Sequence, residues 1–303
     1  MIKRGQPGRT AGLPGALLSI NLDVIMDISD SFKLYLKDKE VYCSDKSCEY
    51  YHNMMHVFSL FLLQNKLLET EDLNSSVLKD FVLYLKAKGV KNTSIHTYMR
   101  AVKNYCSWGI INSFIPPFEY HIKLPRPDPD QVLPLSHTEV YQILDYIKGS
   151  CSDPDNKELF FRFLLDCGLR SSEALSLERK DVDTDNNIIR INQSKYEKSR
   201  MIPLPEKVRD LIPDTKCKLF DFDISGKNSF FTRIKHGSGV NRIYAHLLRH
   251  TFATSYMVKV GNLEYLRMYL GHSSYDVTRN YIQSAYQCNL LHYDIYKIDD
   301  IFT

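Results

Sequence analysis

The stretch AHLLRHTFATSYM, residues 245–257, decides how the rest of the sequence is interpreted. Read as a helix, it displays His246 and Arg249, three residues apart, on one face. His250 lies four residues after His246, which is the spacing of a zinc-binding pair. A metalloprotease with that pair carries glutamate where this chain has Leu247, so a metal site of that kind is excluded. Taken alone, the pair is best explained as an ordinary solvated helix face.

Three other segments contain polar residues that could form one catalytic site with His246 and Arg249. CGLRSSEALSL places Arg170 after Gly168 at a predicted helix start, with Glu173 one turn later. SKYEKSRMIPL puts Lys195 on a predicted β-hairpin, because the flanking runs NNIIRINQS and SRMIPLP have strand composition. LGHSS places a histidine in a turn, and a tyrosine follows nine residues later. The candidate catalytic set is Arg170, Lys195, His246, Arg249, His272 and Tyr281.

The order of these residues, with LRHTFAT and LGHSS nearly verbatim, resembles the tyrosine recombinase (phage integrase) family. The resemblance covers the second half of the chain. In the first half, NTSIHTYMRAVKNYCSW is similar to the closing helix of that family's core-binding domain. The resemblance implies a mainly α fold with a small β-sheet or hairpin. An all-α N-terminal core-binding domain would precede an α+β catalytic domain.

Carried over from the family, the six residues are its active-site positions. Lys198 competes for the lysine position, and the distance to Pro203–Leu204 favours Lys195. The chemistry agrees with this assignment. Two guanidiniums can hold the oxygens of a reacting phosphodiester without a metal, which suits Arg170 and Arg249. A phenol with a pKa near 10 needs help to attack, so His246 is expected to accept its proton or to donate to the phosphate.

The remaining roles follow from the same reaction. His272 is expected to donate a hydrogen bond to the phosphate, the hairpin lysine to protonate the leaving 5′-oxygen, and Glu173 to orient its neighbours. A phosphotyrosyl bond conserves the energy of the phosphodiester, so no cofactor and no metal are expected.

Three tyrosines compete for the role of nucleophile. Ser273 and Asp276 have capping-box spacing, which predicts a helix start near residue 274. At ~100° per residue, Tyr275 lies roughly 240° and Tyr286 roughly 140° from Tyr281. The three cannot face one phosphate, and the family spacing selects Tyr281.

Periodicity and proline content divide the chain. Apolar residues at three- and four-residue steps predict four helices in the first region, and six prolines between Ile115 and Leu135 predict an extended linker. The predicted organisation is a flexible N-terminal arm over residues 1–27, a helical core-binding (SAM-like) domain over 28–120, a linker over 121–135, a catalytic domain over 136–289 and a tail helix over 290–303.

The tail carries an apolar stripe. Leu291, Ile295, Ile298 and Phe302 recur at steps of four, three and four residues, which would form one face of a short helix. Such a helix must bury its stripe, either on its own catalytic domain or in a neighbouring protomer. Resemblance to Xer-type recombinases implies the second, a head-to-tail ring of four subunits.

Bulk composition sets weaker limits. The 303 residues are 44% hydrophobic and 25% charged, as in soluble globular proteins, and no apolar run could span a membrane. Seven cysteines without a Cys-x-x-Cys pair suggest a reducing compartment, the cytoplasm. A net charge of +3 does not diagnose a DNA partner. His96, Arg100 and Lys103 share one face of a predicted helix and are the candidate DNA-binding residues.

The sequence therefore predicts a site-specific recombinase that cuts and rejoins double-stranded DNA through a 3′-phosphotyrosyl intermediate. It would act as a homo-tetramer on two DNA sites and serve integration, excision or resolution of a mobile element. One alternative is a type IB topoisomerase-like enzyme that relaxes DNA. The other is a DNA-binding or architectural protein without catalysis.

Overall fold

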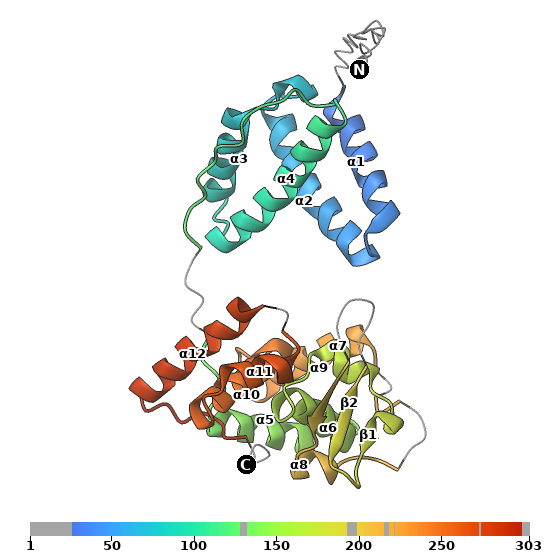
Figure 1. Ribbon diagram of the computed structural model, residues 1–303, viewed down its shortest axis with the longest axis vertical. Coiled ribbons are helices and arrows are strands. Elements are labelled where there is room, and N and C mark those ends of the chain that lie inside the picture. Colours follow the sequence, from blue (N-terminus) through green and yellow to red (C-terminus); the bar gives the residue numbers. More distant parts are fainter. Residues whose placement is uncertain are drawn as a thin grey trace, which may run out of the picture. The chain divides into compact units, whose positions relative to one another are not determined.

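The chain forms two compact units, residues 1–129 and 130–303 (Figure 1). The computed structural model describes residues 26–127, 132–192, 199–214, 218–220, 222–272 and 274–298. Both units are built mainly of helices, and one small sheet lies in the second unit. The fold class predicted from the sequence is confirmed.

The first unit is a helical bundle. Its helices are α1 (Ile28–Tyr42), α2 (Asp45–Gln64), α3 (Ser75–Ala87) and α4 (Asn92–Ile111), with a short 3-10 helix, η1 (Thr70–Asp72), before α3. Side-chain caps fix two of the starts: Asp27 accepts from the Ser29 amide at 2.7 Å, and Asn74 accepts from the Ser76 amide at 2.9 Å. Helix α4 contacts the other three helices, and Tyr105 from its middle is fully buried among aromatic rings.

The chain that leaves α4 packs on this bundle in extended form. Phe118, Tyr120, Ile122 and Leu124 are partly buried against the helical core. They are every second residue, and a side-chain period of two is that of an extended chain with one face turned inward. The predicted linker over 121–135 therefore begins as a segment that lies on the first unit.

The second unit begins with helices and then forms the sheet. Its helices are α5 (His137–Ser150), α6 (Pro154–Leu165), α7 (Ser171–Ser176), α8 (Glu206–Arg209), α9 (Ile224–Gly237), α10 (Ala245–Lys259), α11 (Leu263–Leu270) and α12 (Tyr275–Leu290), with a 3-10 helix η2 (Arg179–Asp181). Helix α5 starts with the predicted capping box of Ser136 and Glu139. Helices α6 and α10 pack against each other in the core, and α12 packs on α10 and α11.

The sheet is antiparallel, in the order β1 (Val182–Asp183), β2 (Ile188–Ile191), β3 (Arg200–Pro203). Ile189 of β2 faces Ile202 of β3, and both are buried. Alternation then turns Arg190 and Met201 outward and brings Arg200 to the inner side with Ile202. The predicted hairpin is present, and its tip, residues 193–198, lies outside the described residues.

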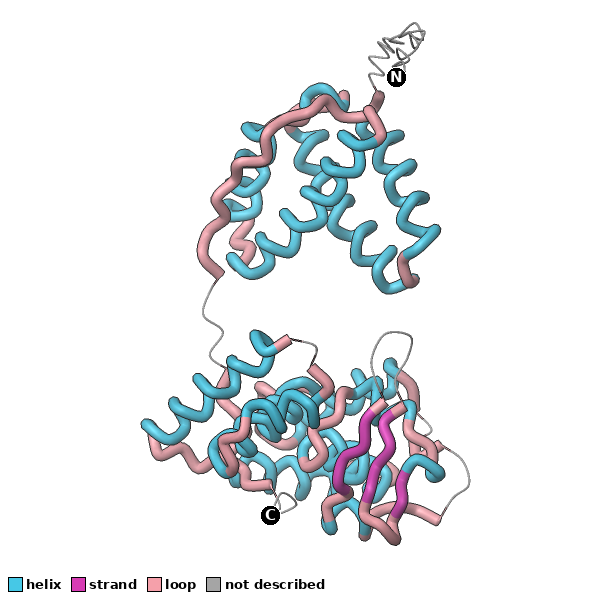
Figure 2. Tube along the Cα trace, viewed as in Figure 1, coloured by secondary structure: helices cyan, strands magenta, loops and turns pink. Residues whose placement is uncertain are grey.

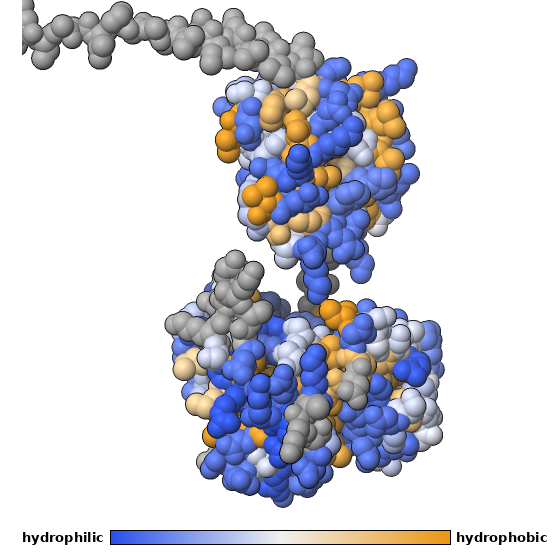
Figure 3. Space-filling view, turned by 90° about the vertical axis from the view of Figure 1, so that its right-hand side faces the viewer, coloured by the Kyte–Doolittle hydropathy of each residue, from blue (hydrophilic) through white to orange (hydrophobic). Residues whose placement is uncertain are grey.

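Both units carry largely hydrophilic surfaces on the face drawn in Figure 3, with apolar residues in scattered groups. Within the described ranges, every helix is too short or too polar to cross a lipid bilayer.

The predicted tail helix over 290–303 is wrong for the part of the tail that is described. Helix α12 ends at Leu290, and residues 291–298 form no helix (Figure 2). The backbone takes a left-handed conformation at His292, with φ of 47°, and the chain then pairs with the segment that enters α5. Ser136 and Ile295 form a β-bridge, and the Tyr296 amide donates to the Leu135 carbonyl at 3.0 Å.

The apolar tail residues are buried on their own catalytic unit. Ile295, Tyr296 and Ile298 are each at most 6% exposed, and the Tyr296 hydroxyl donates to buried Asp166 at 2.8 Å. Leu291 is instead 63% exposed, and Phe302 lies outside the described residues. Of the two destinations considered for the apolar stripe, packing in cis is the one seen for Ile295 and Ile298.

We therefore expect a chain that ends after Asn289 to lose several kcal/mol of unfolding free energy. It would expose the surface that Ile295, Tyr296 and Ile298 cover, and each buried side chain of this size contributes about 1.5–3 kcal/mol. Thermal and urea unfolding measure the loss. A chain that ends after Ile298 keeps the described contacts and should melt like the parent. If the shorter chain melts at the parent temperature, the tail adds nothing in cis.

Candidate active site

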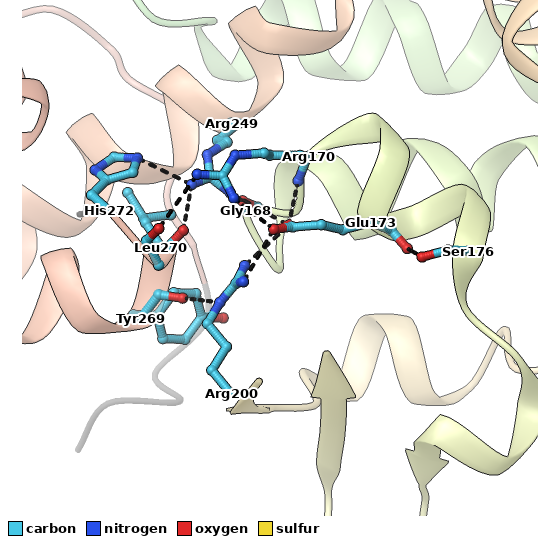
Figure 4. A network of polar contacts seen from close by, with 10 residues as sticks. Gly168, Arg170, Glu173, Ser176, Arg200, Arg249, Tyr269, Leu270 and His272 are labelled. Carbon is cyan, nitrogen blue, oxygen red and sulfur yellow. Dashed lines mark hydrogen bonds and ion pairs between the residues drawn. The ribbon is translucent and has the colours of Figure 1, made fainter. Parts of the chain in front are cut away.

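Arg249 stands at the centre of a group of polar side chains from four parts of the second unit. It projects from α10 and is only 1% exposed. Its Nη1 donates to the Gly168 carbonyl at 2.8 Å, and its Nη2 donates to the Leu270 carbonyl at 2.6 Å (Figure 4). Burial lowers the pKa of Arg249 to about 10, so it stays cationic at neutral pH. Among the described residues its Nε is buried without a hydrogen-bond partner, and such a group can donate to an oxygen of a ligand.

Gly168 shapes the turn that leads from α6 to Arg170. Its φ of 60° is left-handed, and a Cβ there would lie 2.5 Å from the Phe252 ring. A larger residue would therefore disturb both the turn and the carbonyl that binds Arg249. Arg170 follows at the start of α7, with its side chain 31% exposed.

Glu173 binds Arg170 from within α7. Its Oε1 accepts from Arg170 Nη1 at 2.9 Å, and its Oε2 accepts from the Arg170 amide at 2.8 Å. Burial pushes the pKa of Glu173 upward, but hydrogen bonds and charge from Arg200, together with the Arg170 amide and Arg249, outweigh burial and lower it. Glu173 is therefore a carboxylate at neutral pH, within 3.6 Å of Arg249 Nη1.

His272 is held in one tautomer by its two neighbours. Its Nε2 lies 3.1 Å from Arg249 Nη2, and its Nδ1 lies 2.9 Å from Thr278 Oγ1. Because a guanidinium only donates, Nε2 accepts and the proton sits on Nδ1, which donates to Thr278. Burial and the charges of Arg249 and Arg170 lower the pKa of His272 to about 3. The imidazole is thus neutral and orients Arg249, whereas the sequence had suggested a hydrogen-bond donor to phosphate.

Tyr281 lies on α12 with its ring 3% exposed. The ring stacks on His272, with centroids 6.2 Å apart and planes 18° from parallel, and His250 meets it at 5.3 Å. Burial raises the pKa of Tyr281, and the charges of Arg249 and Arg170 oppose that rise only in part. The phenol is therefore protonated at neutral pH, and a phenol in that state would need a base to act as a nucleophile.

His246 shares a pocket with the two arginines. The pocket has a volume of about 250 Å³, and its lining residues come from the start of α7 and the start of α10: Leu169, Arg170, Ser171, Ser172, Ala245, His246 and Arg249. Solvent reaches the His246 ring, but loss of hydration and the charges of Arg249 and Arg170 lower its pKa. A neutral imidazole of this kind can accept a proton at pH 7.

Lys195 and Lys198 both lie in the hairpin tip, outside the described residues. The structure adds two arginines that the sequence analysis passed over, Arg200 and Arg267. A sequence signal for Arg200 existed, because it alternates with Ile202 on the inner face of the predicted strand.

Four arginines bind four consecutive backbone carbonyls at the end of α11. Arg200 Nε donates to Tyr269 O at 2.7 Å, and Arg249 Nη2 donates to Leu270 O at 2.6 Å. Arg170 Nη2 reaches Gly271 O at 3.4 Å, and Arg267 Nη1 donates to His272 O at 3.0 Å. We call residues 269–272 the arginine-held turn. The carbonyl end of a helix carries partial negative charge, which favours cations there.

The candidate DNA-binding residues lie on α4 of the first unit, where two of them contact the extended segment. His96 Nε2 donates to the Pro125 carbonyl at 2.7 Å, and Lys103 Nζ lies 5.0 Å from the centre of the Tyr120 ring. Arg100, which lies between His96 and Lys103 in the sequence, is exposed. The face is thus shared with the chain that follows α4, which the helical spacing alone could not reveal.

Comparison with known proteins adds an independent line of evidence. The model of the phage integrase family matches residues 134–218 and 224–288, and that of the phage integrase SAM-like domain matches residues 27–124. Tyrosine recombinase XerA of Saccharolobus solfataricus is 29% identical over 203 residues, which are 65% of this chain and 65% of XerA. Tyrosine recombinase XerC of Staphylococcus saprophyticus is 25% identical over 273 residues, 82% of this chain and 90% of XerC.

Solved structures share the fold. The integrase of transposon Tn1549, in complex with transposon right end DNA, gives a TM-score of 0.68 at 18% identity, over 88% of this chain and 99% of that one. The XerH recombinase in a post-cleavage complex with a palindromic difH substrate gives 0.66 at 21% identity, over 88% and 84%. The resemblance inferred from the order of the motifs is confirmed. Because the two domain models match in chain order and together cover most of its length, the chain belongs to the phage integrase family of tyrosine recombinases.

Proposed function

We propose that this tyrosine recombinase cuts and rejoins DNA at specific sites through a 3′-phosphotyrosyl bond to Tyr281. One observation carries the proposal: Arg170, Arg249 and His246 line one pocket, and the Arg249 Nε is buried without a partner among the described residues. A phosphodiester oxygen would satisfy that donor. Two guanidiniums side by side suit a group whose negative charge grows during reaction.

The attack transfers the phosphoryl group from one oxygen to another. The Tyr281 oxygen forms a bond to phosphorus, the bond from phosphorus to the 5′-oxygen breaks, and the phenol gives up its proton. We assign His246 as the acceptor of that proton, because its lowered pKa keeps it neutral at pH 7. His272 orients Arg249 through Nε2, and Glu173 orients Arg170. We propose no cofactor and no metal in these steps.

The leaving 5′-oxygen requires a proton, and we propose Lys195 as its source, with Lys198 as the competitor. Sulfur in place of the bridging 5′-oxygen makes a leaving group that needs no proton. Cleavage by Lys195→Ala should therefore be slow on ordinary DNA and near the parent rate on the sulfur-substituted substrate. Lys198→Ala is the matched control and should cleave both substrates at near the parent rate. Rescue of Lys198→Ala alone would move the role to that residue.

The DNA is double-stranded, and each unit is proposed to contact it. The SAM-like unit would supply Arg100, whereas His96 and Lys103 would have to leave the Pro125 carbonyl and the Tyr120 ring to reach phosphate. We propose domain boundaries near residues 120, 135 and 289, and the arm predicted over 1–27 lies, except for residues 26 and 27, outside the described residues. We place the protein in the cytoplasm, where a DNA-acting protein with free cysteines is suited to the reducing environment.

We propose a homo-tetramer on two DNA sites that serves the integration, excision or resolution of a mobile element. The described tail packs on its own catalytic unit, so we propose that the contact between subunits lies elsewhere. Helix α12 exposes an apolar stripe at steps of four residues: Ile282 is 44% exposed, Tyr286 66% and Leu290 64%. Such a stripe on the helix of the nucleophile suits contact with a second copy.

Plasmids that carry two target sites test this function. A recombinase yields recombinant circles, a topoisomerase-like enzyme yields relaxed circles only, and a DNA-binding protein without catalysis yields neither. We expect recombinant circles, with relaxation as a minor product. The other two outcomes would each replace the proposal.

A further inference from the structure

Arg200 holds together three segments of the active site without lining its pocket. It opens β3, and its side chain is 10% exposed. Its Nη1 and Nη2 donate to the two carboxylate oxygens of Glu173 at 3.1 and 3.0 Å, and its Nε donates to the Tyr269 carbonyl at 2.7 Å (Figure 4). All three guanidinium nitrogens thus have protein partners. The fork geometry of the two parallel bonds is the strongest arrangement available to this pair of groups.

The guanidinium also packs against the arginine-held turn. A Cβ at Gly271 would lie 3.0 Å from Arg200 Nη1, and Gly271 has a left-handed φ of 65°. A side chain at residue 271 would strain the left-handed backbone and press on the Arg200 guanidinium. Arg200 therefore fixes the turn before α12 relative to β3 and to Glu173 of α7.

Glu173 is a single carboxylate among three guanidiniums. Its Oε1 accepts from Arg170 and from Arg200, and its Oε2 lies 3.6 Å from Arg249 Nη1. Arg170 and Arg249 are the residues proposed to hold phosphate. A carboxylate left without Arg200 would attract both of them in a poorly hydrated site, where charge interactions are strong.

We propose that Arg200 is a positioning residue that occupies Glu173, so that Arg170 and Arg249 keep their N–H groups directed at the phosphate. It acts through these neighbours and does not touch the DNA. This inference rests on the proposed function. It predicts that adduct formation slows in an Arg200 variant largely because the Glu173 carboxylate remains without its partner.

The test is therefore a rescue. Arg200→Met removes the fork and keeps the apolar stem, Glu173→Gln keeps the hydrogen bonds of the α7 cap and removes the charge, and a double variant combines them. Single-turnover formation of the covalent adduct on a nicked substrate is measured at saturating DNA, along with DNA affinity and melting temperature. Arg190→Ala is the control, because Arg190 is a strand arginine that pairs with Asp183 at the surface.

We expect Arg200→Met to form the adduct about 10²-fold more slowly, as small displacements in an active site do. DNA affinity should stay near the parent value. The double variant should regain on the order of tenfold of the lost rate, since residues in one ion network couple strongly. Arg200→Lys, which keeps the charge without the fork, should fall between parent and Met. Arg190→Ala should match the parent.

Three results would overturn the inference. They are a parent-like rate for Arg200→Met, a double variant as slow as the two losses multiplied, and loss of DNA affinity in step with rate. If Arg200→Met is too unstable to assay, the same comparison is made with Arg200→Gln, which can still donate to Tyr269 O. A parent protein that forms no adduct at all would instead count against the proposed function.

Discussion

Replacing Tyr281 with phenylalanine should abolish covalent attachment to DNA and leave DNA binding near the parent value. The change removes only the oxygen that forms the bond to phosphorus. The ring remains, so its stacking on His272 and its contact with His250 are retained. Ser171 and Ser172 are the hydroxyl-bearing residues in the described lining of the pocket, and the substitution leaves them in place.

A nicked substrate that loses a short strand after cleavage traps the adduct, which denaturing gels reveal. Tyr275→Phe and Tyr286→Phe are matched controls. Both tyrosines lie on α12, but their side chains are 52% and 66% exposed, against 3% for Tyr281. The controls should form the adduct normally. A denaturation-resistant band from Tyr281→Phe would mean that another residue carries the bond.

Loss of either arginine that we propose to bind phosphate should slow cleavage by a similar factor but affect stability very differently. Removing one donor that stabilises charge in a transition state costs roughly 3–4 kcal/mol of barrier, or about 10²–10³ in rate. We expect this for Arg170→Ala and for Arg249→Ala. Binding should weaken far less, because many other phosphate contacts support it.

The difference in stability follows from burial. Arg249→Ala leaves the carbonyls of Gly168 and Leu270 without their donor, and each unsatisfied buried group costs about 1–3 kcal/mol. Arg170 is 31% exposed, so its removal should change the melting temperature little. Calorimetry beside single-turnover cleavage separates the two effects. Equal losses of binding and of cleavage would show that these arginines only dock the DNA.

The sequence was most informative where a motif is local. His246 and Arg249 share a helix, and the turn with His272 leads into the helix of Tyr281, so spacing alone brings these groups near one another. It was least informative about contacts made across the fold. The role of Arg200 depends on Glu173 and Tyr269, which are 27 and 69 residues away. No periodicity within one segment encodes such pairs.

The predicted tail helix was wrong because contacts from elsewhere in the fold decide the backbone there. Steps of four and three residues in 290–303 fit a helix, but the backbone of residues 294–296 pairs with the backbone of residues 135–137 instead. Tertiary hydrogen bonds outweighed a weak local preference. The segment after α4 is extended, as its prolines predicted. Its apolar residues Phe118, Tyr120, Ile122 and Leu124 pack on the bundle, which the prolines alone did not indicate.

The arginine-held turn has a consequence for how the active site tolerates distortion. Four arginines from different elements each donate a hydrogen bond to the backbone of residues 269–272: Arg170, Arg200, Arg249 and Arg267. A displacement of this backbone would therefore move all four side chains together. If DNA binding displaces residues 269–272, we expect the arginine side chains to move with them. The distances between these side chains would then change less than their positions in the domain. Alignment of the reacting groups can thus survive deformation elsewhere in the molecule.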